Sequence, residues 1–179
     1  GGAGFVASHL AEAALTQGFE VVVIDIFNSE TTPVKNKNKN INILLDIAKK
    51  NNIRLEIYKS DIRNEKAIEK IFTQEKPNIV IHAAALARDR DSMDIPLDFI
   101  KTNVIGSQNI INAAAKVEEI EQFIIISTRS AVGQTKSADS LMTEDQPMRP
   151  INPYGATKLA MEGLFHSYHS DTNVSVKIC

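Results

Sequence analysis

The chain has 179 residues, of which 43% are hydrophobic and 23% charged, and its formal net charge is −2. This length and apolar content suffice for one globular domain with a hydrophobic core. The small charge and the absence of a basic stripe argue against nucleic acid as a partner, and no apolar run reaches the ~18 residues that a membrane span needs.

The single cysteine, Cys179, allows no internal disulfide and is typical of a reducing compartment. We therefore expect a cytoplasmic protein without membrane contact. Residue 1 is not methionine, a glycine turn opens the sequence with no strand before it, and the sequence stops within the apolar run 174–179. We expect residues 1–179 to form one dinucleotide-binding domain that is truncated at both ends.

The first third of the chain alternates helical and strand patterns. Apolar residues between Phe5 and Ala14 recur at helical spacing, and Gly18 closes that predicted helix. The β-branched run 21–24, which ends at Asp25, is typical of a buried parallel strand. We read residues 35–40 as a short polar turn and residues 41–50 as a helix.

The same alternation continues to the end of the chain. Asn64 is a candidate helix cap, Pro77 breaks the helix that it opens, and the region with Gly133, Pro147 and Pro150 has no strong period. The remaining predicted elements are strands over 53–58, 79–81 and 123–126, helices over 64–74 and 96–116, a loop over 133–150, and a last helix that Tyr154 and Lys158 open.

Strands that alternate with helices specify an α/β domain with a parallel sheet. We predict a Rossmann-type doubly wound sheet with helices on both faces. In the common strand order 3-2-1-4-5-6 the first strand is central, and this is the strand that we expect to be missing here.

The glycine turn has the spacing of a phosphate-binding loop. Gly1 permits a tight turn, Gly4 lets the backbone approach a pyrophosphate, and the small Ala7 allows close packing of helix and strand. Asp25 ends the next strand about 20 residues on, where a carboxylate accepts hydrogen bonds from ribose hydroxyls. The same carboxylate repels a 2′-phosphate, so we predict NAD rather than NADP.

Two further strand ends are predicted to face the same cofactor. Asp61 and Ile62 follow the strand over 53–58, where the adenine edge would lie. The alanines at positions 83–85 follow the strand over 79–81, and their small side chains would let the cofactor pass close. Tight helix–sheet packing explains any one of these alanines equally well.

Tyr154 and Lys158 are four residues apart in a predicted helix and so share one face. An ammonium beside a phenol favours the phenolate, which makes Tyr154 a candidate acid/base near neutral pH. Thr128 ends a strand, and ligands in open α/β sheets bind beyond the carboxyl ends of strands. Its hydroxyl is a candidate for the reacting substrate oxygen, although a strand-end hydroxyl is otherwise an ordinary helix cap.

With these motifs the chain resembles the extended short-chain dehydrogenase/reductases, specifically the NAD-dependent sugar-nucleotide epimerase/dehydratase family. The matching segments are 1–10, 25–28, 61–63, 82–85, 103–106, 127–133 and 152–158. The resemblance implies a catalytic trio of Thr128, Tyr154 and Lys158. It also implies NAD binding by Gly1, Gly4, Phe5, Val6, Asp25, Ile26, Asn28, Asp61, Ile62, Ala83, Ala84, Ala85, Tyr154 and Lys158.

Within this family the chain looks like the 4-epimerases of UDP-sugars, with UDP-glucuronate epimerases the nearest in pattern. The resemblance implies a nucleotide-sugar substrate, contacts to it from Arg90, Ser92 and Thr128, a homodimer, and a C-terminal substrate segment that is missing here. The stretch around Arg90 reads equally well as a solvated loop. Arg129-Ser130 stands where 4,6-dehydratases usually have Asp-Glu, which argues against that subgroup.

Three other functions stay open at this point. A sugar-nucleotide dehydratase or reductase of the same family is the enzymatic alternative, and a catalytically silent NAD-binding sensor or scaffold is the non-enzymatic one.

His166 and His169 sit three apart, but no third or fourth ligand is near them in sequence, so we expect no metal site.

Overall fold

The computed structural model describes residues 1–28, 32–134, 141–143, 145–172 and 174–179. Its strands form two parallel sheets, one of two strands and one of three. The first sheet holds β1 (Val21–Asp25) and β2 (Leu55–Lys59); the second holds β3 (Ile79–His82), β4 (Gln122–Ile125) and β5 (Ser175–Ile178) in that spatial order.

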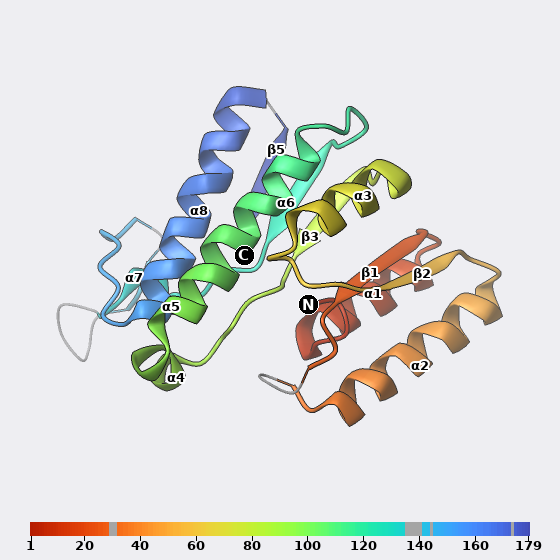
Figure 1. Ribbon diagram of the computed structural model, residues 1–179, viewed down its shortest axis with the longest axis horizontal. Coiled ribbons are helices and arrows are strands. Elements are labelled where there is room, and N and C mark those ends of the chain that lie inside the picture. The colour runs from red at the N-terminus through yellow and green to blue at the C-terminus, as the bar shows by residue number, and fades with distance from the viewer. Residues whose placement is uncertain (29–31, 135–140, 144, 173) are drawn as a thin grey trace.

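Helices connect these strands and cover them (Figure 1). In chain order they are α1 (Phe5–Thr16), α2 (Val34–Asn51), α3 (Glu65–Glu75), α4 (Asp89–Asp94), α5 (Pro96–Phe99), the π-helix η1 (Ile100–Ile105), α6 (Gly106–Ala114), α7 (Arg129–Val132) and α8 (Pro153–Thr172). The helices α1 and α2 lie with β1 and β2 on one side of the molecule, and α6 and α8 lie with β3–β5 on the other (Figure 1).

The predicted α/β class and its parallel pairing are confirmed. Val21 pairs with Leu55, Ile79 with Gln122, and Gln122 with Ser175, each in parallel register. Spatial orders β2-β1 and β3-β4-β5 are the two halves of the predicted order 3-2-1-4-5-6. Between β1 and β3, the position of the first strand, no strand of the described residues pairs with either edge.

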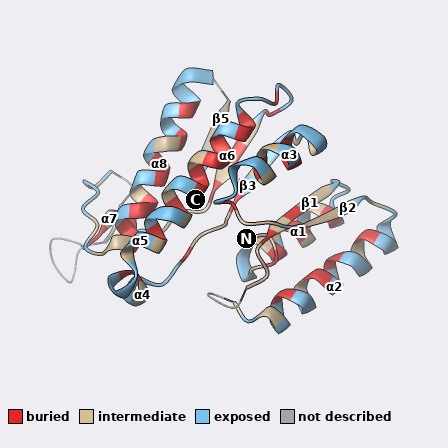
Figure 2. Cartoon of the chain, in the orientation of Figure 1, coloured by how far each residue is buried: buried red, intermediate tan, exposed pale blue. Residues whose placement is uncertain are grey.

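Each sheet has its own hydrophobic core, as the buried residues in Figure 2 indicate. The larger core packs β3 and β4 against α3, α6 and α8, with Phe123, Met161 and Phe165 fully buried in it. The smaller core packs β1 against α1 and α2 through Leu15, Val23 and other aliphatic side chains. Burial of such side chains is worth ~1.5–3 kcal/mol each.

The glycine turn lies where the two halves meet. The nitrogen of Gly1 donates to the Ile24 carbonyl at 2.8 Å, and Gly2 donates to the same oxygen at 3.0 Å. A Cβ on Gly1 would stand 2.7 Å from the Cα of Ala84, just after β3. A residue with a side chain would therefore separate the turn from the end of β3.

Several predicted boundaries differ from the structure. Residues 35–40, predicted to be a polar turn, belong to α2, which starts after Pro33. Lys37 is buried in this helix because its ammonium forms an ion pair with the Asp25 carboxylate. The helix expected over 96–116 is divided by η1 and ends at Ala114. The strand expected over 53–58 is β2, and the apolar run at the end of the chain forms β5.

The region expected to be a loop over 133–150 lacks helix and strand where it is described, and residues 135–140 and 144 lie outside the described part. Gly133 pairs with Arg149 in an isolated parallel bridge, with φ of +90°. A Cβ on Gly133 would stand only 2.0 Å from the Arg149 carbonyl oxygen. Only glycine fits this backbone conformation and this contact.

We therefore predict that Gly133→Ala lowers the free energy of unfolding by about 1–3 kcal/mol. Gly163→Ala is the matched control, because that glycine lies in α8 with open space around its Cβ position. The control should stabilise the protein by about 0.5–1 kcal/mol through helix propensity. Urea unfolding followed by circular dichroism measures both; equal effects of the two substitutions would contradict the assignment.

Candidate active site

One cavity of about 400 Å³ lies at the carboxyl ends of β1, β2, β3 and β4. Its lining includes every residue predicted to contact NAD: Gly1, Gly4, Phe5, Val6, Asp25, Ile26, Asn28, Asp61, Ile62, Ala83, Ala84, Ala85, Tyr154 and Lys158. The glycine turn and the tyrosine–lysine pair, about 150 residues apart in sequence, thus face one space. Thr32, Lys37, Arg63, Thr102 and Ser127 line it as well, and the sequence analysis assigned none of them to the cofactor.

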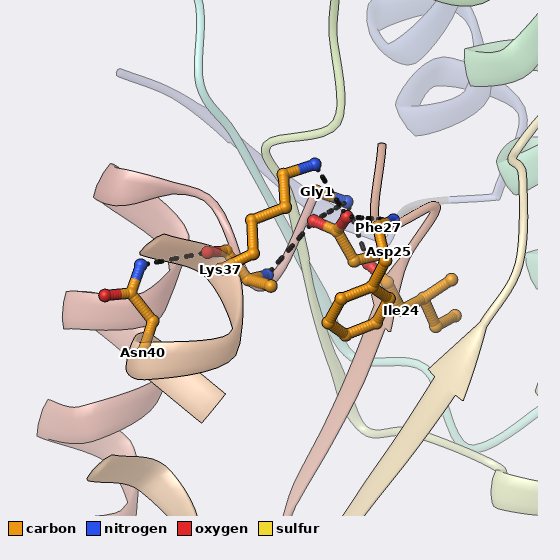
Figure 3. Close-up of polar contacts among 7 residues, drawn as sticks. Gly1, Ile24, Asp25, Phe27, Lys37 and Asn40 are labelled. Carbon is orange, nitrogen blue, oxygen red and sulfur yellow. Dashed lines mark hydrogen bonds and ion pairs between the residues drawn. The ribbon is translucent and has the colours of Figure 1, made fainter. Parts of the chain in front are cut away.

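Asp25 is buried, with 1% of its surface exposed. It is at the centre of the polar contacts that surround the glycine turn (Figure 3). Its Oδ1 accepts from the Phe27 amide at 2.7 Å and from Lys37 Nζ at 2.9 Å, and its Oδ2 accepts from the Ala3 amide at 3.2 Å. Asn40 donates to the Ala3 carbonyl at 3.0 Å. The side chain of Asp25 therefore ties the glycine turn, the end of β1 and α2 together.

Burial by itself would raise the pKa of Asp25, but the nearby Gly1 amine, the Lys37 hydrogen bond and the Phe27 amide outweigh it and hold the pKa below its usual value. The carboxylate is thus charged at neutral pH and stabilised by backbone and lysine donors. Both of its oxygens already accept hydrogen bonds from groups within the protein. This arrangement could not be foreseen from the strand-end position of Asp25 alone.

The loop after β2 is held from two directions. Arg63 binds the Asp61 carboxylate through both Nε and Nη2, at 2.9 and 2.6 Å to Oδ2. Asn109 on α6 donates to the Ile62 carbonyl at 2.9 Å. A Cβ on Gly106 would meet the Ile62 side chain at 2.6 Å, so glycine lets α6 approach this loop.

Asn103 fixes the loop after β3 and is fully buried in the π-helix η1. Its side chain accepts from the Leu86 amide at 2.8 Å and donates to the Leu86 carbonyl at 3.0 Å. It also donates to the Thr157 hydroxyl at 3.0 Å, and Thr157 in turn donates to the Tyr154 carbonyl at 2.8 Å. These hydrogen bonds fix the position of Leu86, and of the alanine segment that precedes it, relative to α8.

Tyr154 lies in the first turn of α8, which starts at Pro153; the Asn152 side chain caps this turn by accepting from the Gly155 amide at 2.7 Å. Its ring packs edge-on against Phe99, with centroids 6.1 Å apart. Burial raises the pKa of Tyr154, a hydrogen bond with Thr128 opposes this, and the Asp89 carboxylate adds to the rise. The expected lowering of the pKa of Tyr154 is wrong for this structure, because burial is the largest effect and Thr128, rather than Lys158, is the group that opposes it.

Thr128 accepts from the Ser130 amide at 3.2 Å and so caps α7, as the alternative interpretation of its sequence position predicted. Thr128 also hydrogen-bonds Tyr154, which opposes the rise in the pKa of the phenol; its contact to a substrate oxygen stays a prediction.

Lys158 is buried and points toward the end of β4. Its Nζ donates to the Ile126 carbonyl and to Met161 Sδ, the latter at 3.4 Å. Burial lowers the pKa of Lys158 to about 8, and the carboxylate of Glu162 opposes that effect. Ser127, next to Ile126, donates to Glu162 Oε1. These contacts place the Lys158 ammonium, whose pKa of about 8 is close to neutral pH, in the wall of the cavity.

His82 ends β3 and is buried beside Phe165, with its Nε2 2.8 Å from the Ser107 hydroxyl. Burial, with a smaller contribution from the Lys158 charge, lowers the pKa of His82 to about 3. The imidazole is therefore neutral at physiological pH and acts as a packing and hydrogen-bonding group.

The three residues predicted to contact substrate, Thr128, Arg90 and Ser92, are not part of the cavity lining, although the neighbouring Ser127 is. Arg90 is exposed on α4, and Ser92 is fully buried with its hydroxyl donating to the Asp89 carbonyl at 2.6 Å. The Arg90 stretch, for which a solvated loop was the alternative, is the short helix α4.

Among the described residues, no three His, Cys, Asp or Glu side chains are placed to hold a metal ion. In the same residues no helix has both the length and the apolar character of a membrane span.

Comparison with known proteins places this geometry in context. The family model described as "NAD dependent epimerase/dehydratase family" matches residues 1–179. The UDP-glucose 4-epimerase of Bacillus subtilis (strain 168) is 30% identical over 173 residues, which are 97% of this chain and 48% of that protein. The chain thus spans about half the length of the curated relatives that it matches.

Solved structures give the same result. A UDP-glucuronic acid 4-epimerase from Bacillus cereus, in complex with UDP-glucuronic acid and NAD, superposes with a TM-score of 0.82 at 32% identity, covering 99% of this chain and 53% of that one. A UDP-glucose 4-epimerase from Thermus thermophilus in complex with NAD superposes with a TM-score of 0.82 at 28% identity, covering 99% and 52%.

The Asp25–Lys37 pair predicts a specific pH dependence of stability. Asp25→Asn leaves the Lys37 ammonium buried without its anion and should cost about 3–5 kcal/mol at pH 7. Because the pKa of Asp25 is depressed in the folded protein, its contribution is complete above the unfolded pKa of about 3.9 and is lost as the pH falls through the lower folded value. The deficit of the variant should therefore shrink below pH ~4.

Urea unfolding at pH 7 and at lower pH measures this difference. Asp46→Asn, an exposed carboxylate on the same helix α2, is the control and should change stability by less than about 0.5 kcal/mol. A deficit of Asp25→Asn that stays constant with pH would show that packing, rather than charge, accounts for its effect.

Proposed function

The chain belongs to the NAD dependent epimerase/dehydratase family, and on that premise we propose that the full-length protein is an NAD-dependent 4-epimerase of a UDP-sugar. The observation that carries the proposal is the shared cavity: the glycine turn, Asp25, the Ala83–Ala85 segment, Tyr154 and Lys158 all line it. Relatives whose names state 4-epimerase activity on UDP-sugars support the substrate class.

The residues present fit a dinucleotide. Gly1 and Gly4 form a cradle that side chains would fill, since a Cβ would stand 2.7 Å from Ala84 Cα at Gly1 and 3.0 Å from the Gly1 carbonyl at Gly4. The first amides of α1 open toward this turn, where a pyrophosphate is favoured. Asp25 and Asn28 line the end suited to a ribose, and the resemblance assigns the other predicted cofactor residues to the same ligand.

NAD, when bound, would supply the hydride acceptor and then the hydride donor for the sugar carbon. We assign the proton to Tyr154, whose phenolate takes it from the C4 hydroxyl as the C4–H bond breaks and the ketone forms. Tyr154 would return the same proton to the C4 oxygen when the opposite face of the ketone is reduced, so no external oxidant or reductant would be consumed. We propose that Thr128, which hydrogen-bonds Tyr154, contacts the same substrate oxygen.

Lys158 supplies the positive charge near this chemistry. A cation close to the phenol favours its ionised form, and the pKa of Tyr154 is raised by burial in the structure. We propose that Lys158 reaches the nicotinamide ribose and offsets this burial in the working enzyme. The contributions assigned to Arg90 and Ser92 stay predictions.

Two alternatives remain distinct from this proposal. A dehydratase or reductase of the same family would use the same cofactor site, and the Arg129-Ser130 pair beside Thr128 is the feature that disfavours a 4,6-dehydratase. A silent NAD-binding sensor would need the cavity but neither the phenol nor the ammonium. A homodimer is also proposed, and exposed Leu97, Ile100 and Ile105 along α5 and η1 support an apolar contact there.

The test is Tyr154→Phe in the full-length protein, assayed with UDP-glucose, UDP-glucuronate and UDP-N-acetylglucosamine, with NMR of the products. We expect wild type to form a 4-epimer of one of them without net NADH. The variant should lose about 10²–10⁴-fold in turnover while it still binds NAD, because the hydroxyl and not the ring is removed.

Tyr168→Phe is the matched control on the same helix, since Tyr168 packs against Phe123 in the core, away from the cavity. It should keep near-normal turnover. Unchanged turnover in Tyr154→Phe would remove Tyr154 from the mechanism, and NAD binding without conversion of any sugar would favour the sensor interpretation.

A further inference from the structure

A second buried charge lies one helical turn beyond Lys158. Glu162 follows Lys158 by four residues on α8, so both side chains leave the same face of the helix. Glu162 is 8% exposed and Lys158 3%. A carboxylate so deeply buried is costly unless hydrogen bonds and an opposite charge stabilise it, and the mechanism above makes no use of Glu162.

Both side chains are fastened to consecutive residues at the end of β4. Lys158 donates to the Ile126 carbonyl, and Glu162 accepts from the Ser127 hydroxyl. The start of α8 is thus bound to the strand end by two anchors. Because Ile126 and Ser127 line the cavity, these anchors decide where the Lys158 ammonium lies in it.

The interaction between the two charges acts through space. In the described part of the chain, no carboxylate oxygen lies within 4.0 Å of Lys158 Nζ. Burial lowers the pKa of Lys158 to about 8, and the Glu162 carboxylate is the group that opposes this. In an interior of low dielectric such an interaction persists over several ångströms.

We propose that Glu162 is a positioning residue that keeps the Lys158 ammonium protonated and holds it at the β4 end of the cavity. The inference rests on the proposed function for its catalytic meaning, because a charged Lys158 matters there for the ionisation of Tyr154. The effect of Glu162 on the protonation of Lys158 can be measured whether or not the protein turns over a substrate. Two observations support the proposal: the four-residue spacing of Lys158 and Glu162 in α8, and the hydrogen bonds that join both side chains to consecutive residues after β4.

The other groups that face this region have pKa values outside the range in which Lys158 titrates. The pKa of His82 on β3 is about 3, the pKa of Tyr154 is raised above its usual value, and the pKa values of Asp25 and Asp61 are lowered. Lys37, Arg63 and Arg88 complete the charged lining.

The experiment is a pH titration of full-length protein carrying ¹³Cε-labelled lysine, with the Lys158 resonance assigned by its loss in Lys158→Met. The wild-type midpoint is expected near pH 8, and Glu162→Gln should move it down by about one pH unit. Relative to wild type, kcat/KM of Glu162→Gln should then be about fivefold lower at pH 8 and nearly equal at pH 6.

Asp171→Asn removes an exposed carboxylate from the same helix and is the matched control, with no expected change in the midpoint. An unchanged midpoint in Glu162→Gln, or a loss of kcat/KM that is the same at both pH values, would overturn the proposal. A shifted midpoint in a protein that epimerises no sugar would support the inference while contradicting the proposed function.

If Glu162→Gln does not fold, Ser127→Ala keeps the test decisive. This variant retains the carboxylate and removes only its hydroxyl donor. The Lys158 midpoint should stay at or above the wild-type value, because the charge of Glu162 is no longer shared with Ser127. A fall in the midpoint would show that packing at β4, and not the charge of Glu162, sets the state of Lys158.

Discussion

Parallel pairing within both sheets is the constraint on which the candidate site depends. Because the strands of each sheet run the same way, the segments that follow β1, β2, β3 and β4 emerge at one edge and line a single cavity. The glycine turn enters that edge between β1 and β3, where Gly1 hydrogen-bonds Ile24 and lies against Ala84. Residues far apart in sequence become neighbours for this reason, and their chemistry can be combined.

Two sets of buried opposite charges, Asp25 with Lys37 and Lys158 with Glu162, lie at or beside the cavity. Asp25 accepts from backbone amides and from Lys37, which ties the glycine turn to α2. Lys158 and Glu162 are anchored to Ile126 and Ser127. Such pairs cost desolvation energy, and each is offset by hydrogen bonds that also orient a backbone segment. The cavity is lined both by the glycine turn and by Tyr154 and Lys158, and our proposed function depends on this combination.

Motifs with a local cause were predictable from the sequence, and features set by tertiary contact were not. The spacing of Tyr154 and Lys158 correctly placed both in one helix facing the cavity, because helical periodicity is local. The polar stretch at 35–40 has no apolar period, so its sequence did not predict that Lys37 is buried in a helix beside Asp25. For Tyr154 the neighbouring lysine was visible but the extent of burial was not, and burial decides the direction in which its pKa moves. The Lys-x-x-x-Glu spacing of Lys158 and Glu162 was a usable signal that the sequence analysis passed over.

We propose that one cavity brings a bound NAD and Tyr154 to the same sugar carbon. The most direct test of this proposal follows deuterium placed at C4 of the UDP-sugar that the full-length protein converts. Our account predicts a 4-epimer that retains the deuterium at C4 and no net NADH, because the hydride leaves and returns within one site. A 4-epimer that carries solvent hydrogen at C4 would contradict it, since the carbon would then have exchanged a proton with water.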